Sequence, residues 1–161
     1  MDRIYTFSEN SNTKDWRIVN DGVMGGISSS SLQITKEGHG HFSGKVSLEN
    51  NGGFASVQLN TNMPITKNHS YIVLRIKGDG KKYEFRIKEN PLQPEAYVQP
   101  FATSGVWETI RLNIGDFYPQ YRGRKLNIGN FKGETIQQIS FLIANKKEEK
   151  FDLWMEWIGV E

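Results

Sequence analysis

The sequence predicts an all-β protein built as a sandwich or a barrel. In many segments apolar and polar residues alternate, as at residues 83–88, which is typical of a half-buried strand. Turn-forming residues separate these segments at a spacing of roughly 12 residues, which indicates about ten or eleven strands. No stretch of similar length keeps a helical period, and no βαβ alternation is visible, which argues against a doubly wound nucleotide-binding fold.

The expected strands follow one another along the chain. At residues 42–48, Phe42, Val46 and Leu48 share one face of a strand, while Lys45 lies on the other. Further strands are expected at residues 57–59, 71–77, 83–88, 107–113, 139–144 and 151–158. The best helical candidate, residues 132–138, is short and begins beside Gly133. Turn signals lie at residues 20–22, 37–40, 50–53, 78–80, 90–91 and 104–105.

Composition excludes several classes of protein. The length of 161 residues fits one β-sandwich domain over residues 1–161. The chain has no cysteine, which excludes disulfides, thiolate metal sites and cysteine nucleophiles. A net charge of +2 is too small to indicate a nucleic-acid partner. We expect no membrane-spanning segment, because no long apolar window occurs, and a cytoplasmic location, because no secretory signal is recognisable.

Motifs of catalytic or cofactor-binding sites are weak or missing. Gly38, Gly40 and Gly44 miss the dinucleotide-binding spacing and precede no helix. His39 and His41 would share one strand face, but no third metal ligand follows at a convincing spacing. The serines at residues 28–31 lack the surroundings of a nucleophile elbow. We therefore predict no catalytic residue, no cofactor and no metal ligand, and leave open a calcium site built from backbone carbonyls.

One unusual loop is the first candidate for a binding site. Residues 15–30 contain glycines at 22, 25 and 26 together with Asn20, Asp21 and Met24. The loop could present Asp21 and Met24 to a partner, since methionine adapts to surfaces of varied shape. Alternatively, the side chains of Asn20 and Asp21 could satisfy the backbone of a buried loop.

Basic residues form the second candidate. Arg75, Lys77, Arg86 and Lys88 fall on the polar faces of two consecutive strands and could form one patch. Residues 121–125 add Arg122 and Arg124 without an acidic neighbour. Such a patch could meet an acidic protein surface, phosphates or an anionic glycan. The alternative is a solvated sheet face with local ion pairs.

Two segments carry a family resemblance. They read Asn-Asp-Gly-Val-Met-Gly-Gly at residues 20–26 and Glu-Asn-Asn-Gly-Gly-Phe at residues 49–54, with further matches between about residues 7 and 158. In these motifs the chain resembles the complex I intermediate-associated protein 30 family. The resemblance implies a β-sandwich of jelly-roll, galactose-binding-like type. Relatives in eukaryotes are assembly factors for respiratory complex I, and without a nucleotide-binding domain this chain is similar to a compact bacterial member.

The resemblance implies a non-catalytic protein-binding domain that assists assembly or stability of a protein complex. Its expected partner is a protein, such as a subunit of a membrane complex. The expected contact residues are Asn20, Asp21, Met24, Arg75, Arg86, Arg122 and Arg124. The main alternative is a carbohydrate-binding module-like domain, because sandwiches often bind sugars and Trp and Tyr rings can stack on them. An unrecognised hydrolase is a third possibility.

Overall fold

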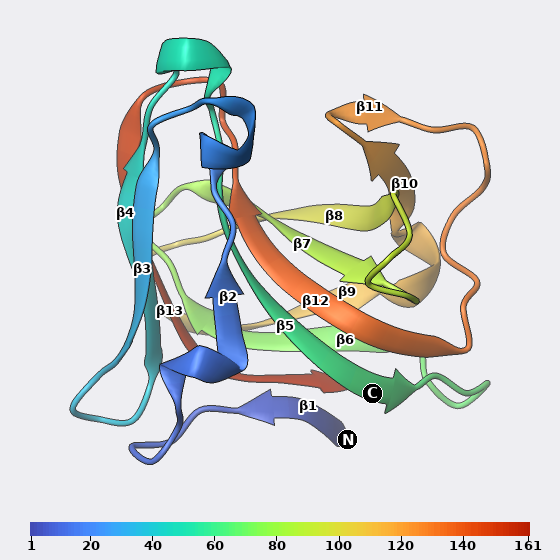
Figure 1. Ribbon diagram of the computed structural model, residues 1–161. Helices are drawn as coiled ribbons and strands as arrows, with labels where there is room; N and C mark the ends of the chain where they lie inside the picture. The colour runs from blue at the N-terminus through green and yellow to red at the C-terminus, as the bar shows by residue number, and fades with distance from the viewer.

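The computed structural model consists of two antiparallel β-sheets packed face to face (Figure 1). It describes residues 1–161 apart from the side chains of Val23 and Met24. One sheet has the strand order β3-β4-β13-β6-β9, with β1 paired to β13. These strands are β1 (Asp2–Thr6), β3 (Ser29–Ile34), β4 (Gly40–Val46), β6 (Tyr71–Lys77), β9 (Trp107–Asn113) and β13 (Glu149–Val160). This architecture confirms the all-β sandwich predicted from the alternating pattern.

The second sheet has the order β11-β10-β8-β7-β12-β5-β2. Its strands are β2 (Trp16–Ile18), β5 (Ala55–Pro64), β7 (Lys82–Lys88), β8 (Ala96–Ala102), β10 (Tyr118–Tyr121), β11 (Arg124–Lys125) and β12 (Thr135–Ile143). The helical candidate at residues 132–138 is wrong, because residues 135–138 open β12 and pair with β5, and Gln138 pairs with β7 as well. Strand pairing outweighs a short and weak helical pattern.

Alternation along the strands fills the core between the sheets. On β7, the side chains of Tyr83, Phe85 and Ile87 point inward and are buried, and the intervening residues point to the outer face. Phe141 of β12 lies in the same layer, with its ring centroid 5.0 Å from that of Phe85 and 6.3 Å from that of Trp16. Inward-facing aromatic and aliphatic residues thus hold the two sheets together, and on β7 the alternate residues Glu84, Arg86 and Lys88 remain for the outer face.

Consecutive strands do not always share a sheet. β6 pairs with β13 and β9, whereas β7 pairs with β8 and β12. Arg75 and Lys77 therefore lie on the outer face of one sheet, and Arg86 and Lys88 on the outer face of the other. The prediction that these four residues form one patch is wrong. The turn at residues 78–81 crosses between the sheets instead of closing a hairpin.

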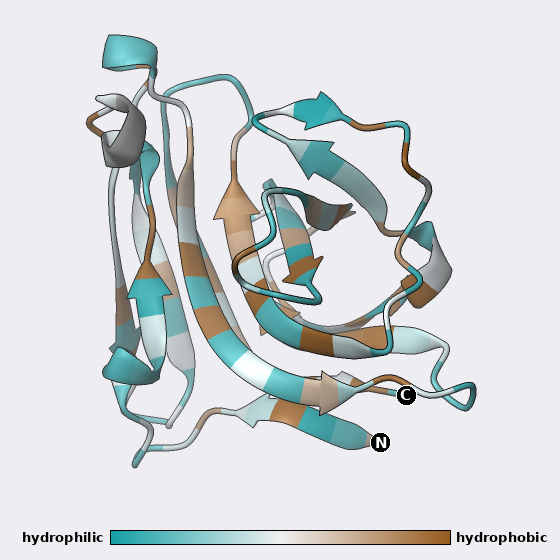
Figure 2. Ribbon diagram, turned by 45° about the vertical axis from the view of Figure 1, so that its right-hand side comes forward, coloured by the Kyte–Doolittle hydropathy of each residue, from teal (hydrophilic) through white to brown (hydrophobic). Residues whose placement is uncertain are grey.

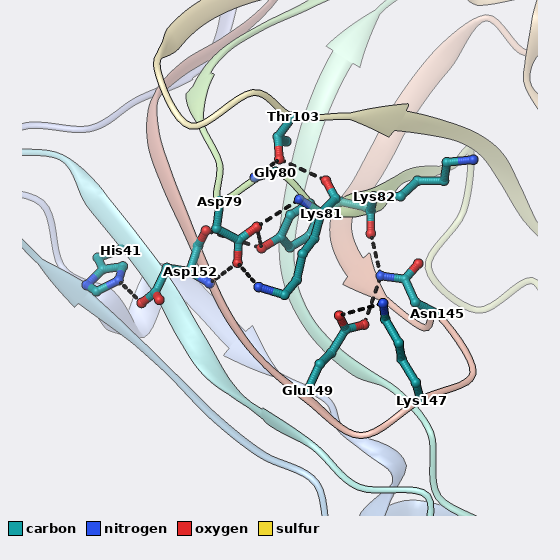
Figure 3. Close-up of polar contacts among 11 residues, drawn as sticks. His41, Asp79, Gly80, Lys81, Lys82, Thr103, Asn145, Lys147, Glu149 and Asp152 are labelled. Carbon is teal, nitrogen blue, oxygen red and sulfur yellow. Dashed lines mark hydrogen bonds and ion pairs between the residues drawn. The ribbon is translucent and has the colours of Figure 1, made fainter.

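Asp79 joins the two sheets where the chain crosses from β6 to β7 (Figure 3). Its carboxylate accepts hydrogen bonds from the Tyr83 hydroxyl at 2.9 Å, the Asp152 backbone N–H at 2.8 Å and the Lys81 ammonium at 3.2 Å. Asp152 belongs to β13 and Tyr83 to β7, so one carboxylate joins strands of both sheets. Burial raises the pKa of Tyr83, and the charge of Asp79 raises it further, so the phenol stays protonated and donates.

We expect Asp79→Ala to lower the free energy of unfolding by about 2 kcal/mol, because it leaves the Asp152 N–H unpaired and removes a partner of the Tyr83 hydroxyl. Urea unfolding measures the change. Asp116→Ala, at an exposed aspartate, is the control. Equal stability of the two variants would show that the Asp79 cluster contributes nothing to joining the sheets.

Candidate functional site

The two distinctive loop segments meet at Asp21, in the 3-10 turn η2 (Asp21–Met24). The Asp21 side chain is fully buried. Its carboxylate accepts hydrogen bonds from the backbone N–H groups of Ser28 at 3.0 Å, Gly53 at 2.7 Å and Phe54 at 3.2 Å, and also from the Ser28 hydroxyl. Asp21 therefore binds its own loop to the loop at residues 47–54 and does not itself reach the surface.

Electrostatics keep the Asp21 carboxylate charged in this position. Burial alone raises its pKa, because a charge is less stable away from water. The hydrogen bonds from Ser28, Gly53 and Phe54 together outweigh burial and bring the pKa below the ordinary value for aspartate. An ionised acceptor makes stronger hydrogen bonds than a neutral one, which suits a residue that holds two loops together.

Residues next to Asp21 and in the facing loop also help to hold the two loops together. Asn20 accepts hydrogen bonds through its side-chain oxygen from the Ser56 N–H at 3.2 Å and the Ser30 hydroxyl at 2.9 Å. Asn50 and Asn51, in the turn η3 (Glu49–Asn51), adopt φ values of 54° and 61°, a left-handed conformation that asparagine tolerates better than most residues. The predicted contact residues Asn20 and Asp21 thus hold together the loops at residues 19–26 and 47–54. These two loops are called the wall below. The side chain of Met24 lies outside the described part of the structure.

This wall borders a groove of about 710 Å³ on the outer face of the seven-stranded sheet. The opposite border is formed by residues 120–123 at the end of β10, where the strands are largely hydrophilic (Figure 2). Figure 1 shows the two borders on either side of the curved sheet, with η3 at the top and β10 and β11 at the right. The lining of the wall includes Val19, Leu48, Asn51, Gly52, Gly53 and Phe54.

Strand pairing places polar side chains in rows across the groove floor. In one row, Arg86 of β7 lies opposite Ser140 of β12, and Ser140 lies opposite Gln58 of β5. In the next row, Lys88 lies opposite Gln138, whose amide donates to Asn60 at 3.1 Å. Amide and hydroxyl groups on neighbouring strands thus supply both donors and acceptors to whatever enters the groove.

The cations of the floor differ in how they are paired. Arg86 donates to the Glu84 carboxylate at 2.7 Å and to the Gln120 side-chain oxygen at 2.6 Å, so its charge is balanced within the site. Lys88 donates to the Gln93 backbone carbonyl at 3.0 Å. Burial lowers the pKa of Lys88, and the charge of Glu95 opposes that shift.

The structure brings some predicted residues together and separates others. Arg86 and Arg122 both line the groove, and Arg124 lies nearby on β11 with an exposed side chain. Arg75 lies on the opposite face of the sandwich, where it forms an ion pair with Glu156 at 3.5 Å. Sequence reasoning missed the groove glutamines Gln58, Gln120 and Gln138. These glutamines are polar residues on apolar strands, which indicated that they face outward. Whether they meet in one groove depends on which strands pair, and the sequence does not show this.

The tryptophans lie elsewhere. Trp16 is buried in the core, and Trp154 of β13 stacks on His41 at 4.5 Å, with the Lys77 ammonium 4.8 Å from its ring. Trp107 packs near His39, with ring centroids 4.6 Å apart. Within the described part of the structure, the groove lining contains no tryptophan and offers Phe54 and Tyr121 as its aromatic rings.

Comparison with known proteins identifies the family and the fold. The model of the family described as complex I intermediate-associated protein 30 matches residues 5–155. No protein of curated function matches the sequence. In the described part of the chain, no helix has the length and apolar character needed to cross a membrane.

Several solved structures share the architecture. The family 11 carbohydrate-binding module of the cellulosomal cellulase Lic26A-Cel5E of Clostridium thermocellum superposes with a TM-score of 0.72 at 18% identity, covering 99% of this chain and 94% of that one. The family 11 module from the same organism in complex with a β-1,3-1,4-mixed-linked tetrasaccharide gives 0.69 at 18% identity, covering 96% and 93%. At this identity the likeness establishes the fold alone, a jelly-roll sandwich of galactose-binding-like type.

Proposed function

This chain belongs to the complex I intermediate-associated protein 30 family, and from that premise we propose that it is a non-catalytic binding domain that assists the assembly or stability of a protein complex. The groove on the seven-stranded sheet is the proposed contact site. The observation that carries the proposal is the combination of a hydrogen-bonding floor with an apolar wall in one open groove.

An extended polypeptide segment fits this combination. Its backbone needs donors and acceptors in alternation, which Gln58, Gln138 and Ser140 can supply. Its apolar side chains need a surface to leave water, which Leu48 and Phe54 offer on the wall. Asp21 and Asn20 then act by positioning this wall, while Arg86 and Arg122 contact the partner.

A second candidate is glycan binding, and the fold favours it. The similar structures include carbohydrate-binding modules, one of them in complex with a tetrasaccharide. Tyr121, 41% exposed at the edge of the groove, is a ring on which a sugar could stack.

Site-specific photo-cross-linking tests the proposal. A benzophenone amino acid replaces Tyr121 in the groove or, as a matched control, Tyr71 on the other sheet, whose 37% exposure is similar. After irradiation in cells of the source organism, we expect Tyr121 to capture a defined protein that Tyr71 does not capture. The interaction is then reproduced with the purified protein.

Two outcomes would contradict the proposal. If both positions capture the same proteins, the groove is not a specific protein site. If position 121 captures no protein and the unmodified chain binds soluble mixed-linkage glucan in affinity electrophoresis, the glycan candidate replaces it.

A further inference from the structure

We propose that the segment bound in the groove is acidic, and that one of its carboxylates pairs with Lys88. This inference rests on the proposed function and specifies the chemistry of the partner. It follows from the charges of the groove, from the position of Lys88 and from the surroundings of Tyr121 at its edge and of Tyr118 on the same strand, β10.

The charges of the groove are unbalanced. Its lining contains the cations Arg86, Lys88, Arg122 and Lys146 and a single carboxylate, that of Glu84. Glu84 is already bonded to Arg86 at 2.7 Å. The ion pairs found among the described residues include none with Lys88, Arg122 or Lys146. Glu95, outside the groove lining, acts on Lys88 through its charge without forming an ion pair with it. The lining itself therefore keeps an excess of positive charge for a ligand to balance.

Lys88 is the best placed of the three. It lies on the floor beside Gln138, in the central strand β7, whereas Arg122 and Lys146 lie in exposed turns. Its side chain is half-buried, and its ammonium contacts the Gln93 carbonyl, which leaves further N–H donors for a ligand. A carboxylate that reaches this position would form a charge-assisted hydrogen bond away from bulk water, where such a bond is stronger than at the surface.

The aromatic rings favour an acidic peptide over an acidic glycan. The Arg122 guanidinium lies 5.3 Å from the Tyr121 ring centroid, and the Lys125 ammonium lies 5.3 Å from that of Tyr118. Each of these rings thus has a cation close to it, which competes with a sugar for the ring surface. Leu48, 43% exposed at the wall, suits an apolar side chain of a peptide better than a sugar hydroxyl.

Three probes and three variants test this inference at low salt. The probes are a labelled peptide of alternating Glu and Leu, the same peptide with Gln in place of Glu, and an oligogalacturonate. The variants are Lys88→Met, which removes the charge but keeps the length of the chain, Lys88→Arg, which keeps the charge, and the control Lys82→Met, on the same strand but outside the groove lining. Fluorescence anisotropy and calorimetry measure the affinities, and urea unfolding confirms that each variant folds.

We expect the Glu peptide to bind at least about tenfold more tightly than the Gln peptide. Lys88→Met should remove most of this difference, while Lys88→Arg and Lys82→Met should retain it. Equal binding of both peptides would overturn the inference that the bound segment is acidic. The groove would then still be a site that binds a polypeptide. Lys88-dependent binding of the oligogalacturonate alone would overturn both proposals in favour of an acidic glycan. If no probe binds, the inference of an acidic segment is overturned, and photo-cross-linking at position 121 decides the proposed function separately.

Discussion

Replacement of Asp21 by alanine is expected to lower the free energy of unfolding by roughly 3–5 kcal/mol. The side chain is fully buried and accepts hydrogen bonds from three backbone N–H groups and one hydroxyl. Without the carboxylate the three N–H groups lose their acceptor, whereas the Ser28 hydroxyl keeps the Ser47 carbonyl at 3.3 Å. Urea unfolding at neutral pH measures the effect, and Asp116→Ala again serves as the control. A loss below about 1 kcal/mol, typical of an average substitution, would contradict the role of Asp21 in joining the loops.

Lowering the pH should weaken the hydrogen bonds by which the Asp21 carboxylate joins the two loops of the wild-type chain. The pKa of Asp21 is lower in the folded state than its ordinary value, so the folded state favours the charged form. The contribution of the charged Asp21 side chain to the free energy of unfolding is fully present above the unfolded-state pKa. It is lost as the pH falls through the folded-state pKa. Asp21→Asn cannot ionise, and in either orientation its amide places an N–H toward backbone donors, that of Ser28 or those of Gly53 and Phe54. The difference in stability between wild type and Asp21→Asn should therefore shrink in acid. If the two pH profiles are parallel, the charge of Asp21 does not support the loops.

Gly52→Ala is expected to destabilise the protein by about 2–4 kcal/mol. A Cβ at position 52 would lie 2.6 Å from the Ser47 carbonyl oxygen, 2.9 Å from that of Glu49 and 2.7 Å from the Asp21 carboxylate. Two of these neighbours are backbone atoms, which can move only if the whole loop moves. Because this loop forms the groove wall, binding in the groove should weaken together with stability.

Gly22→Ala is the matched control for this substitution. Gly22 belongs to the other loop of the pair, and the described structure places nothing within 4 Å of a Cβ added there. Its free energy of unfolding should stay within about 1 kcal/mol of wild type. If Gly52→Ala unfolds at the same urea concentration as Gly22→Ala, the close packing of the two loops is not required for the fold.

Alternation predicted most of the inward-facing residues, although Leu48, expected on the apolar face with Phe42 and Val46, lies beyond the end of β4 and is 43% exposed. Alternation in β7 predicted that Tyr83, Phe85 and Ile87 enter the core and that Arg86 and Lys88 stay outside, and burial confirms it. The loop at residues 20–26 and the segment at residues 49–54 were also distinctive as sequence, because several glycines there stand beside Asn and Asp. These features are local, since the direction of a side chain along a strand depends on its own backbone.

Which strands pair, and therefore which side chains meet, became clear from the folded sandwich alone. It separated Arg75 from Arg86 by placing β6 and β7 in different sheets, and it gathered Gln58, Lys88 and Ser140 on one floor. It also turned Asp21 inward, where N–H groups more than thirty residues further along the chain bind its carboxylate. The reason is physical: each backbone edge can pair with any other edge, and the choice is made by packing and hydrogen bonding over the whole sandwich, which alternation within one segment does not encode.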